Sequence, residues 1–213
     1  MDENINFVKD KKVERTMENL EKHNMEAYYV HDEKELLKKI SEITKEGETV
    51  AVGGSMTLFE TGIIDYLKCG KFNFLDRYKE GIRADELKEV YRKSFSADSY
   101  FVSSNAITEN GELYNVDGTG NRVAAMIYGP DKVIVVASTD KIVKDLDAAI
   151  KRNQEYSAPA NAKRLNRKTP CAKIGFCCDC SSEERICNEY TLIKRQPVKG
   201  RIKVIFIDKK LGY

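Results

Sequence analysis

The sequence predicts an α/β fold: an open, mostly parallel sheet with helices on both faces. Three observations support this. Apolar strand-like runs alternate with amphipathic helical runs along most of the 213 residues, an order typical of right-handed βαβ units. The run KVIVVAS (132–138) is almost continuously apolar, as in a strand buried on both faces. Hydrophobic residues at 41% and charged residues at 33% indicate a globular chain.

The N-terminal residues predict a helix, a strand and a second helix. Apolar side chains recur at helical spacing among charges within residues 1–25, which indicates an amphipathic helix. The run AYYV then predicts a short strand. Asp32 followed three residues later by Glu35 is a capping-box pattern, so a helix begins there, and Gly47 lies beyond its end.

The next segment repeats the strand and helix alternation. TVAV (49–52) predicts a strand, and a glycine turn leads from it into a helical pattern. KFNFL, ADELKEVYRKSF and DSYFVSS then read as strand, helix and strand. The resulting βαβαβ order predicts a parallel sheet.

The chain then turns back before the alternation resumes. Asn110-Gly111 between apolar residues predicts a tight hairpin. NRVAAMIYGP predicts a helix that ends at its Gly-Pro pair, and KVIVVAS predicts the next strand. KIVKDLDAAIKRNQEY predicts a helix. Its expected buried face carries Ile142, Val143, Leu146 and Ile150.

We expect a single domain over residues 1–213, because the length favours one unit with an elaboration. It comprises an N-terminal helix (1–25), an α/β core (26–158) and a basic, cysteine-rich C-terminal extension (159–213). Two strand-like runs, TLIKR and RIKVIFID, close the extension.

The first candidate site is the turn after the strand at 49–52. Its two glycines let the backbone approach a ligand, helix N-terminal N–H groups favour an anion, and hydroxyls add directional donors. The alternative is an ordinary turn capped by a serine. Neither the NAD pattern G-x-G-x-x-G nor a P-loop is present, so neither nucleotide is supported. The candidate ligand-binding residues here are Gly53, Gly54, Ser55 and Thr57.

The second candidate site is the segment SSNAITENGELYNVDGTGNR, which has too few apolar side chains to be core. Its clustered polar groups and glycines predict a pocket wall. The alternative is a solvated loop, because Asn-Gly and Asp-Gly are common turn dipeptides. The candidate ligand-binding residues here are Asn105, Asp117, Gly118, Gly120, Asn121 and Arg122.

These motifs carry a resemblance. VGGSMTLFETG, SSNAITENGELYNVDGTGNRVAAMIYGP and KVIVVAS together resemble the LUD domain, the bacterial lactate-utilisation family, within the NagB/RpiA/CoA-transferase-like group. The resemblance covers about residues 7–190. It implies a ligand cleft at the carboxyl ends of the strands and a part in oxidising lactate to pyruvate. In the larger group the Gly/Ser/Thr turn typically holds a phosphate or carboxylate.

Glu109 is the candidate catalytic residue. The string Thr-Glu-Asn-Gly at 108–111 is similar to the glutamate motif with which CoA transferases attack an acyl-CoA. A carboxylate can form an acyl anhydride with a thioester, or act as a general base if its pKa is raised. The match is four residues long, and the remainder of a CoA transferase is absent.

Five of the six cysteines are clustered in CAKIGFCCDCSSEERIC, the third candidate site. A C-x5-C-x2-C-x6-C spacing could surround a zinc ion or a cluster with thiolates. A [4Fe–4S] cluster is suggested by the lactate-pathway resemblance and not by the spacing. The alternative is a reduced loop without metal. The candidate metal ligands are Cys171, Cys177, Cys180 and Cys187.

The charge distribution is uneven although the net charge is only +2. From Lys163 to Tyr213 there are thirteen Lys and Arg against five Asp and Glu. Lys163, Arg164, Arg167 and Lys168 could rim a cleft for an anion or form a solvated face. No nucleic-acid recognition motif accompanies them, so a nucleic-acid partner is not supported.

We expect a cytoplasmic protein. No apolar run approaches the roughly 20 residues needed to cross a bilayer, and the N-terminus is acidic where a signal peptide would be basic. Neither His23 nor His31 lies near a motif, so histidine triads and mononuclear histidine metal sites are not supported.

The sequence thus predicts a domain that binds a small anionic organic acid or phosphate. Three functions remain open. The chain is a component of an iron–sulfur-dependent lactate-oxidising system with iron–sulfur partner subunits, a stand-alone CoA- or sugar-phosphate-processing enzyme using Glu109, or a non-catalytic binding module with a structural zinc. The sequence leaves a homo-oligomer open.

Overall fold

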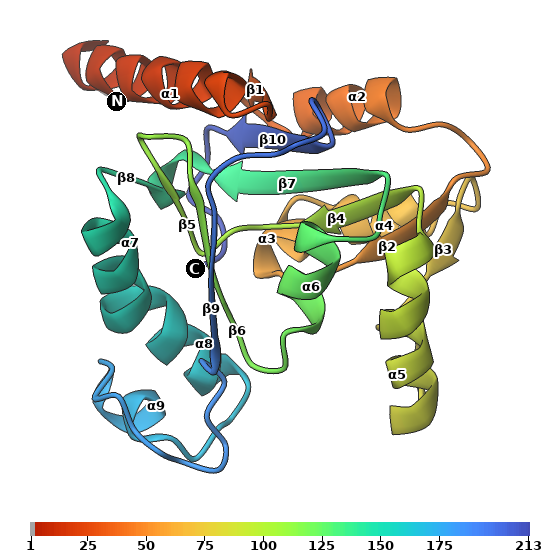
Figure 1. The fold of residues 1–213 in the computed structure, drawn as a ribbon, viewed down its shortest axis with the longest axis vertical. Coiled ribbons are helices and arrows are strands. Elements are labelled where there is room, and N and C mark those ends of the chain that lie inside the picture. The colour runs from red at the N-terminus through yellow and green to blue at the C-terminus, as the bar shows by residue number, and fades with distance from the viewer. Residues whose placement is uncertain (1–2) are drawn as a thin grey trace.

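The computed structural model describes residues 3–213 and contains two sheets (Figure 1). The larger is a six-stranded parallel sheet with the order β1-β10-β7-β4-β2-β3, and the smaller is a four-stranded mixed sheet with the order β8-β5-β6-β9. The strands are β1 (Glu26–Val30), β2 (Thr49–Val52), β3 (Asn73–Leu75), β4 (Ser99–Val102), β5 (Ala106–Thr108), β6 (Leu113–Asp117), β7 (Lys132–Ser138), β8 (Ile142–Val143), β9 (Glu189–Ile193) and β10 (Ile202–Ile207).

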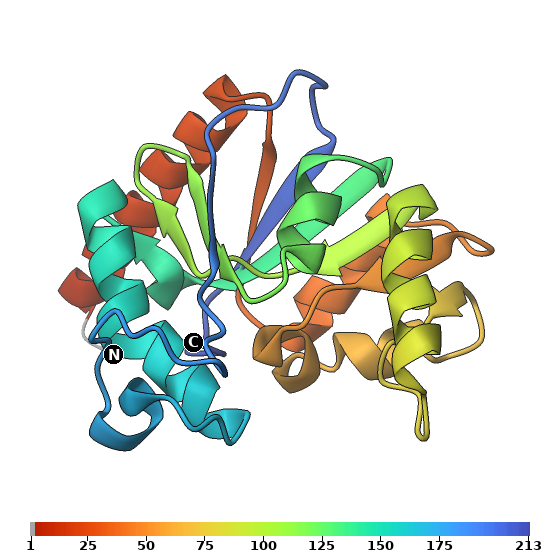
Figure 2. The same cartoon turned by 60° about the horizontal axis from the view of Figure 1, so that its bottom comes forward.

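Nine α-helices are present in the described residues, most of them short. Figure 2 shows α7 and α8 on one side of the molecule and α3, α4 and α5 on the other. The helices are α1 (Glu3–Lys22), α2 (Glu33–Ile43), α3 (Met56–Glu60), α4 (Ile63–Leu67), α5 (Ala84–Lys93), α6 (Asn121–Ile127), α7 (Leu146–Arg152), α8 (Ala158–Arg164) and α9 (Pro170–Ile174). No helix in residues 3–213 is long and apolar enough to cross a membrane.

The parallel sheet is buried on both faces, as the continuous apolar pattern of 132–138 predicts. Alternate residues of β7 enter two different clusters, Val133 and Val135 in one and Ile134 and Val136 in the other. The first cluster also contains side chains of α1, α6 and the smaller sheet, and the second contains side chains of α2, α3 and α4. The predicted fold class, with helices on both faces of a mostly parallel sheet, is confirmed.

The C-terminal extension is built into the sheet. β10 lies between β1 and β7 and is parallel to both, with Val204 opposite Ala27 and Val135. β9 forms one edge of the smaller sheet, where Leu192 is opposite Tyr114. Residues 159–213 therefore complete both sheets of the core that was expected to end at 158.

The hairpin predicted at Asn110-Gly111 is confirmed, because β5 and β6 are antiparallel around it. The N-terminal helix is confirmed over Glu3–Lys22, and positions 1 and 2 of the predicted segment lie outside the described residues. The Asp32 cap is also confirmed: its side chain accepts a hydrogen bond from the Glu35 N–H at 2.8 Å.

The helix predicted from Lys141 was wrong at its start. Ile142 and Val143 form β8, which pairs in parallel with β5. The helix begins only after Asp145, whose side chain accepts a hydrogen bond from the Ala148 N–H at 2.9 Å. Apolar residues at helical spacing could not reveal that the open edge of β5 would pair with this segment.

The parallel topology determines where the candidate site residues meet. β2, β4 and β7 are neighbours in the sheet, so their carboxyl ends lie along one edge. Gly53 follows β2, Ser103 follows β4, and Thr139 begins a short 3-10 turn after β7 that ends at Lys141.

Candidate functional site

A cavity of about 580 Å³ opens at this edge of the sheet. Its wall includes residues that follow β2 and β4, the end of β6, the start of α6, and part of the segment after α8. The Gly/Ser turn and the polar segment thus border one hollow. Seven of the ten predicted ligand-binding residues line it: Gly54, Ser55, Asn105, Asp117, Gly118, Asn121 and Arg122.

Lys141 also lines the cavity and was missed by the sequence analysis. Its side chain is only 2% exposed, and its Nζ donates to Thr57 Oγ1 at 3.2 Å and to Ser103 Oγ at 3.0 Å. Burial, together with the positive charges of Arg152 and Arg122, lowers the pKa of Lys141 to about 7. A signal was available, since Lys141 stands just beyond the carboxyl end of the most apolar strand, where α/β proteins place ligands.

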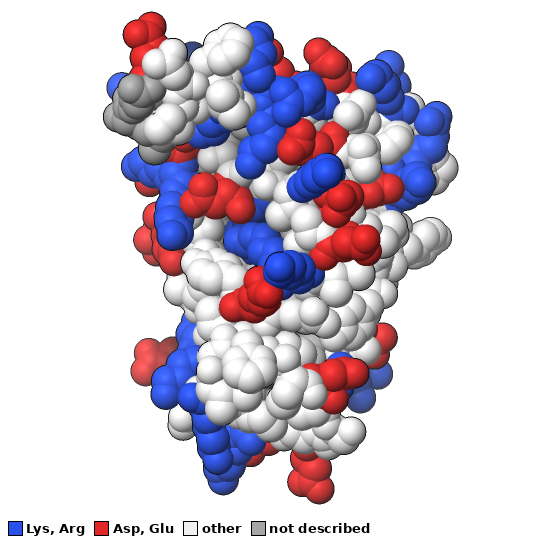
Figure 3. All heavy atoms as spheres, turned by 90° about the vertical axis from the view of Figure 1, so that its left-hand side faces the viewer, with Lys and Arg blue, Asp and Glu red and all other residues white. Residues whose placement is uncertain are grey.

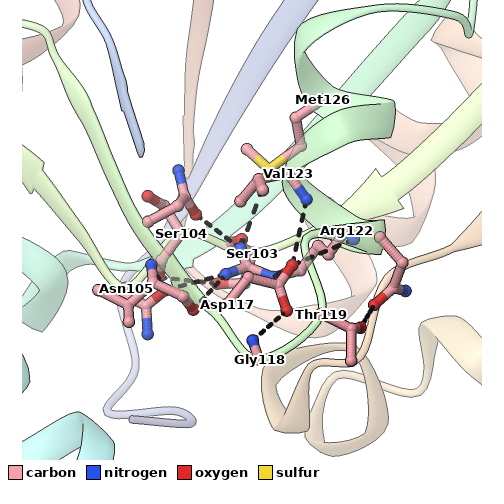
Figure 4. Close-up of polar contacts among 12 residues, drawn as sticks. Ser103, Ser104, Asn105, Asp117, Gly118, Thr119, Arg122, Val123 and Met126 are labelled. Atoms are coloured by element: carbon pink, nitrogen blue, oxygen red, sulfur yellow. Dashed lines mark hydrogen bonds and ion pairs between the residues drawn. The ribbon is translucent and has the colours of Figure 1, made fainter. Parts of the chain in front are cut away.

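Arg122 is a buried crosslink beside the cavity (Figure 4). Its Nη1 donates to the Ser103 carbonyl at 3.0 Å and to Asn115 Oδ1 at 2.6 Å. Its Nη2 donates to Asn105 Oδ1 at 3.1 Å and to the Val116 carbonyl at 2.9 Å. Burial lowers the pKa of Arg122, and its four N–H···O bonds hold the guanidinium in place between β4 and β6.

Asp117 fixes the start of α6 beside this crosslink (Figure 4). Its carboxylate accepts hydrogen bonds from the backbone N–H groups of Gly118, Arg122 and Val123 at 2.8, 3.1 and 3.2 Å. It also lies 3.8 Å from Arg122 Nε. Asp117 therefore directs much of its hydrogen-bonding capacity toward the backbone of its own loop.

Three predicted ligand-binding residues are not among those that line the cavity. Gly53 packs against Arg122, and a Cβ there would come within 2.8 Å of the Arg122 and Val102 side chains. Thr57 is fully buried and accepts the Lys141 hydrogen bond. Gly120 precedes α6 with φ 73°, a left-handed conformation that favours glycine. The structure gives each of them a packing or backbone role.

The cavity is lined by more cations than anions. Arg77 is held there by a 2.8 Å hydrogen bond to Tyr91 Oη and lies over the Tyr78 and Tyr91 rings. Arg164 and Arg167 come from the basic stretch that was a candidate rim. The basic lining residues are Arg77, Arg122, Lys141, Arg164, Arg167 and Arg185, and the acidic ones are Asp117, Glu183 and Glu184.

A family model, the LUD domain, matches residues 13–207 of the chain. The chain belongs to the LUD domain family. No curated protein matches the sequence. Its fold is similar to that of a DUF162 family protein from Deinococcus radiodurans, with a TM-score of 0.55 at 11% identity over 94% of this chain and 98% of that one.

Two further structures resemble this LUD domain only in part. eIF2B delta from Chaetomium thermophilum aligns with a TM-score of 0.37 at 24% identity, over 56% of this chain and 50% of that one. Ribose 5-phosphate isomerase from Plasmodium falciparum aligns with a TM-score of 0.33 at 16% identity, over 53% and 52%. Neither partial likeness bears on the function of this chain.

Glu109 of the LUD domain lies in the β5–β6 turn and is not among the residues that line the cavity. Its carboxylate pairs with Arg15 of α1 at 2.9 Å, and its backbone carbonyl accepts from Asn19 Nδ2 at 2.8 Å. These contacts attach the hairpin to α1. The nucleophilic role of Glu109 toward an acyl-CoA stays a prediction, which loss of acyl-CoA turnover in Glu109→Gln would support.

The four candidate metal ligands lie in one segment of the LUD domain but differ in environment. Cys171 and Cys187 are buried, whereas Cys177 and Cys180 are partly exposed. Cys171 Sγ lies 3.3 Å from Thr169 Oγ1, and Cys177 Sγ accepts from the Asp179 N–H at 3.4 Å. Within residues 3–213, no three His, Cys, Asp or Glu side chains are arranged to hold one metal ion. We therefore derive no chemistry through a metal, and uptake of zinc or a cluster stays a prediction.

Proposed function

We propose that this LUD domain binds a small organic acid or a small phosphate-bearing metabolite in its cavity, as a component of lactate-to-pyruvate oxidation. Membership of the lactate-utilisation family supports the metabolic setting. A volume of about 580 Å³ is in the range of small-molecule pockets. The proposal includes partner subunits with iron–sulfur clusters, which would accept the electrons released when lactate is oxidised.

The observation that carries the proposal is the buried Lys141 at the cavity wall, whose hydrogen-bond partners are uncharged and which lies near two further cations. Both partners of Lys141 Nζ are hydroxyl groups, which carry no charge. Arg152, which lowers the pKa of Lys141 by its charge, donates to the Asn105 carbonyl and to Ser157 Oγ, again neutral acceptors. Arg122 has Asp117 nearby, at 3.8 Å.

Burying a charge without a counter-charge is expensive. Here the cost is concentrated at the wall of a cavity. A bound carboxylate or phosphate would supply negative charge to the arginines of this wall and to the protonated fraction of Lys141. The structure thus favours an anionic ligand over a neutral or cationic one.

The proposal is tested by ligand-dependent thermal unfolding. Lactate, pyruvate, acetyl-CoA and ribose 5-phosphate are titrated in turn, with sodium chloride at matched ionic strength as the control. A ligand that binds only the folded state raises Tm, and the rise grows with its concentration. Indifference of Tm to every member of the panel would overturn the proposal.

Two lysine variants locate the binding. Lys141→Met removes the buried amine, whereas Lys144→Met removes an exposed one three residues further along. We expect Lys141→Met to abolish the ligand-dependent rise in Tm and Lys144→Met to keep it. The opposite result would place binding outside the cavity.

A further inference from the structure

The amine of Lys141 lies where three adjacent parallel strands end. The 3-10 turn after β7 carries Lys141, and Nζ reaches the hydroxyls of Thr57, in the helix after β2, and Ser103, directly after β4. Both hydroxyl-bearing residues are buried, at 0% and 5% exposed. The amine is thus held by residues of the three segments that follow β2, β4 and β7.

The two hydroxyl contacts match the neutral form of the amine. A neutral –NH2 group has two N–H donors and one lone pair, whereas –NH3⁺ has three donors and none. Nζ donates to Thr57 Oγ1 and Ser103 Oγ, so two donors are used. A neutral Lys141 keeps its lone pair available on the side chain that lines the cavity.

The surrounding charges favour this neutral form. Arg152 of α7 and Arg122 of α6 repel a charged ammonium, and burial adds the larger effect. Glu60 of α3 acts in the opposite direction, and its Oε2 accepts a hydrogen bond from the Gly212 N–H at 2.7 Å. The pKa of Lys141, lowered to about 7, leaves a large neutral fraction near neutral pH. A desolvated lysine next to other cations is a known form of activated nucleophile.

We propose that Lys141 is a nucleophilic amine that forms an imine with the carbonyl group of a small 2-oxo acid bound in the cavity. This deepens the proposed function and rests on it, because the acid must first bind there. Nζ forms a bond to the carbonyl carbon, and the carbonyl π electrons move to oxygen, giving a carbinolamine after proton transfer from nitrogen to oxygen. Loss of that hydroxyl with a second proton from nitrogen releases one water and leaves the C=N bond.

The substrate class follows from the same geometry. In a 2-oxo acid the carboxylate and the carbonyl carbon are directly bonded. A carboxylate drawn to the cations around Lys141 therefore brings an electrophilic carbon within reach of Nζ. The Ser103 and Thr57 hydroxyls are placed to pass the protons that leave nitrogen. No oxidant or reductant is needed for this step.

The experiment uses pyruvate as the probe, with sodium cyanoborohydride to reduce an imine to a stable amine. Intact-mass measurement and peptide mapping then locate the adduct. We expect one adduct, on Lys141, which forms on the order of 100-fold faster than on exposed lysines at pH 7.5, because about one part in a thousand of an exposed lysine is neutral there. The rate of adduct formation should rise with pH and reach half of its maximum near pH 7, where half of Lys141 is neutral.

Three controls separate the steps. Lactate has a hydroxyl in place of the carbonyl and cannot form an imine. Excess lactate should therefore compete for the cavity and slow the formation of the pyruvate adduct. Lys141→Arg keeps the cation but cannot deprotonate; it should still be stabilised by lactate and give no adduct. Lys144→Met should react as the wild type does, and circular dichroism confirms that each variant is folded.

The outcomes are distinguishable. If pyruvate raises Tm but Lys141 gives no adduct, or reacts only as fast as exposed lysines, the imine is overturned and the binding function stands. If neither pyruvate nor lactate binds, the imine is overturned; the proposed function fails as well only if acetyl-CoA and ribose 5-phosphate also leave Tm unchanged. If Lys141→Arg does not fold, two measurements on the wild type still test the imine. These are the slowing of adduct formation by lactate and the pH at which the rate of adduct formation is half-maximal.

Discussion

At the scale of single residues, the site depends on how buried polar groups are paired. Lys141 and Arg122 both line the cavity, yet they are held differently. Arg122 has four oxygen acceptors on the surrounding protein, so its position is set before any ligand arrives. Lys141 has two hydroxyl partners and a lowered pKa, so its charge state is the adjustable part of the site.

The lowered pKa of Lys141 predicts a pH dependence of stability. Below about pH 7 the amine is protonated in both the folded and the unfolded chain, and the full cost of its buried charge is present. Between about 7 and the ordinary value of 10.5, the unfolded chain binds the extra proton, so stability rises with pH by at most roughly 1.4 kcal/mol per pH unit from this group.

Urea unfolding of wild type and Lys141→Met, from about pH 6 to about pH 9, measures this contribution. The difference in unfolding free energy should shift in favour of the wild type as pH rises. Lys144→Met provides the control and should track the wild type. A pH-independent difference between wild type and Lys141→Met would contradict the lowered pKa.

Removal of Arg122 should be far more damaging. Arg122→Met removes the guanidinium donor from the Ser103 and Val116 carbonyls and from Asn115 Oδ1, while Asn105 Oδ1 keeps the Val116 N–H. Breaking a buried charged network typically costs about 3–5 kcal/mol, and urea unfolding should show a loss of that order. Arg122→Lys, which keeps the charge but offers fewer donors, should fall between. A loss below about 1 kcal/mol would show that the crosslink is unimportant.

At the scale of elements, the β5–β6 hairpin is joined tightly to α1. A Cβ on Gly111 would lie 2.6 Å from backbone atoms of Asn19 and Leu20, and Gly111 has φ 78°. The Arg15–Glu109 pair and the Asn19 hydrogen bond join the same two elements. The Asn-Gly dipeptide therefore serves two purposes, the turn itself and the close approach of a helix.

Two glycine variants separate these purposes. Gly111→Ala combines positive φ with the clash against α1, whereas Gly47→Ala has positive φ (85°) and open space around the new Cβ. We expect about 1 kcal/mol of destabilisation for Gly47→Ala and roughly 1–3 kcal/mol more for Gly111→Ala. Equal losses in urea unfolding would mean that the hairpin separates from α1 without cost.

On the scale of the whole molecule, the face drawn in Figure 3 carries charges of both signs. Figure 3 shows one face, on which Lys and Arg are interleaved with Asp and Glu over the upper part and uncharged atoms cover much of the lower part. Part of the excess of basic residues in the C-terminal segment lines the cavity, namely Arg164, Arg167 and Arg185. This distribution fits a small anionic ligand.

The cysteine segment makes a separate prediction for the whole molecule. Anaerobic purification, metal analysis and an absorption spectrum should reveal iron with sulfide, or zinc, if the predicted ligands assemble around a metal. Cys177→Ser with Cys180→Ser should then lose the metal, while Cys69→Ser, outside the segment, keeps it. A colourless, metal-free protein would contradict the iron–sulfur prediction.

Patterns in the sequence were enough to predict the order of most strands and helices, the fold class and the family. Periodicity, caps and turn dipeptides are local signals, and each acts within a few residues. The sequence also identified the two polar segments that border the cavity. Only the folded chain shows that β10 lies between β1 and β7, that Ile142 and Val143 form a strand, and that Lys141 rather than Glu109 lines the cavity. Strand order and side-chain burial depend on contacts between residues far apart in the chain, which local patterns do not encode.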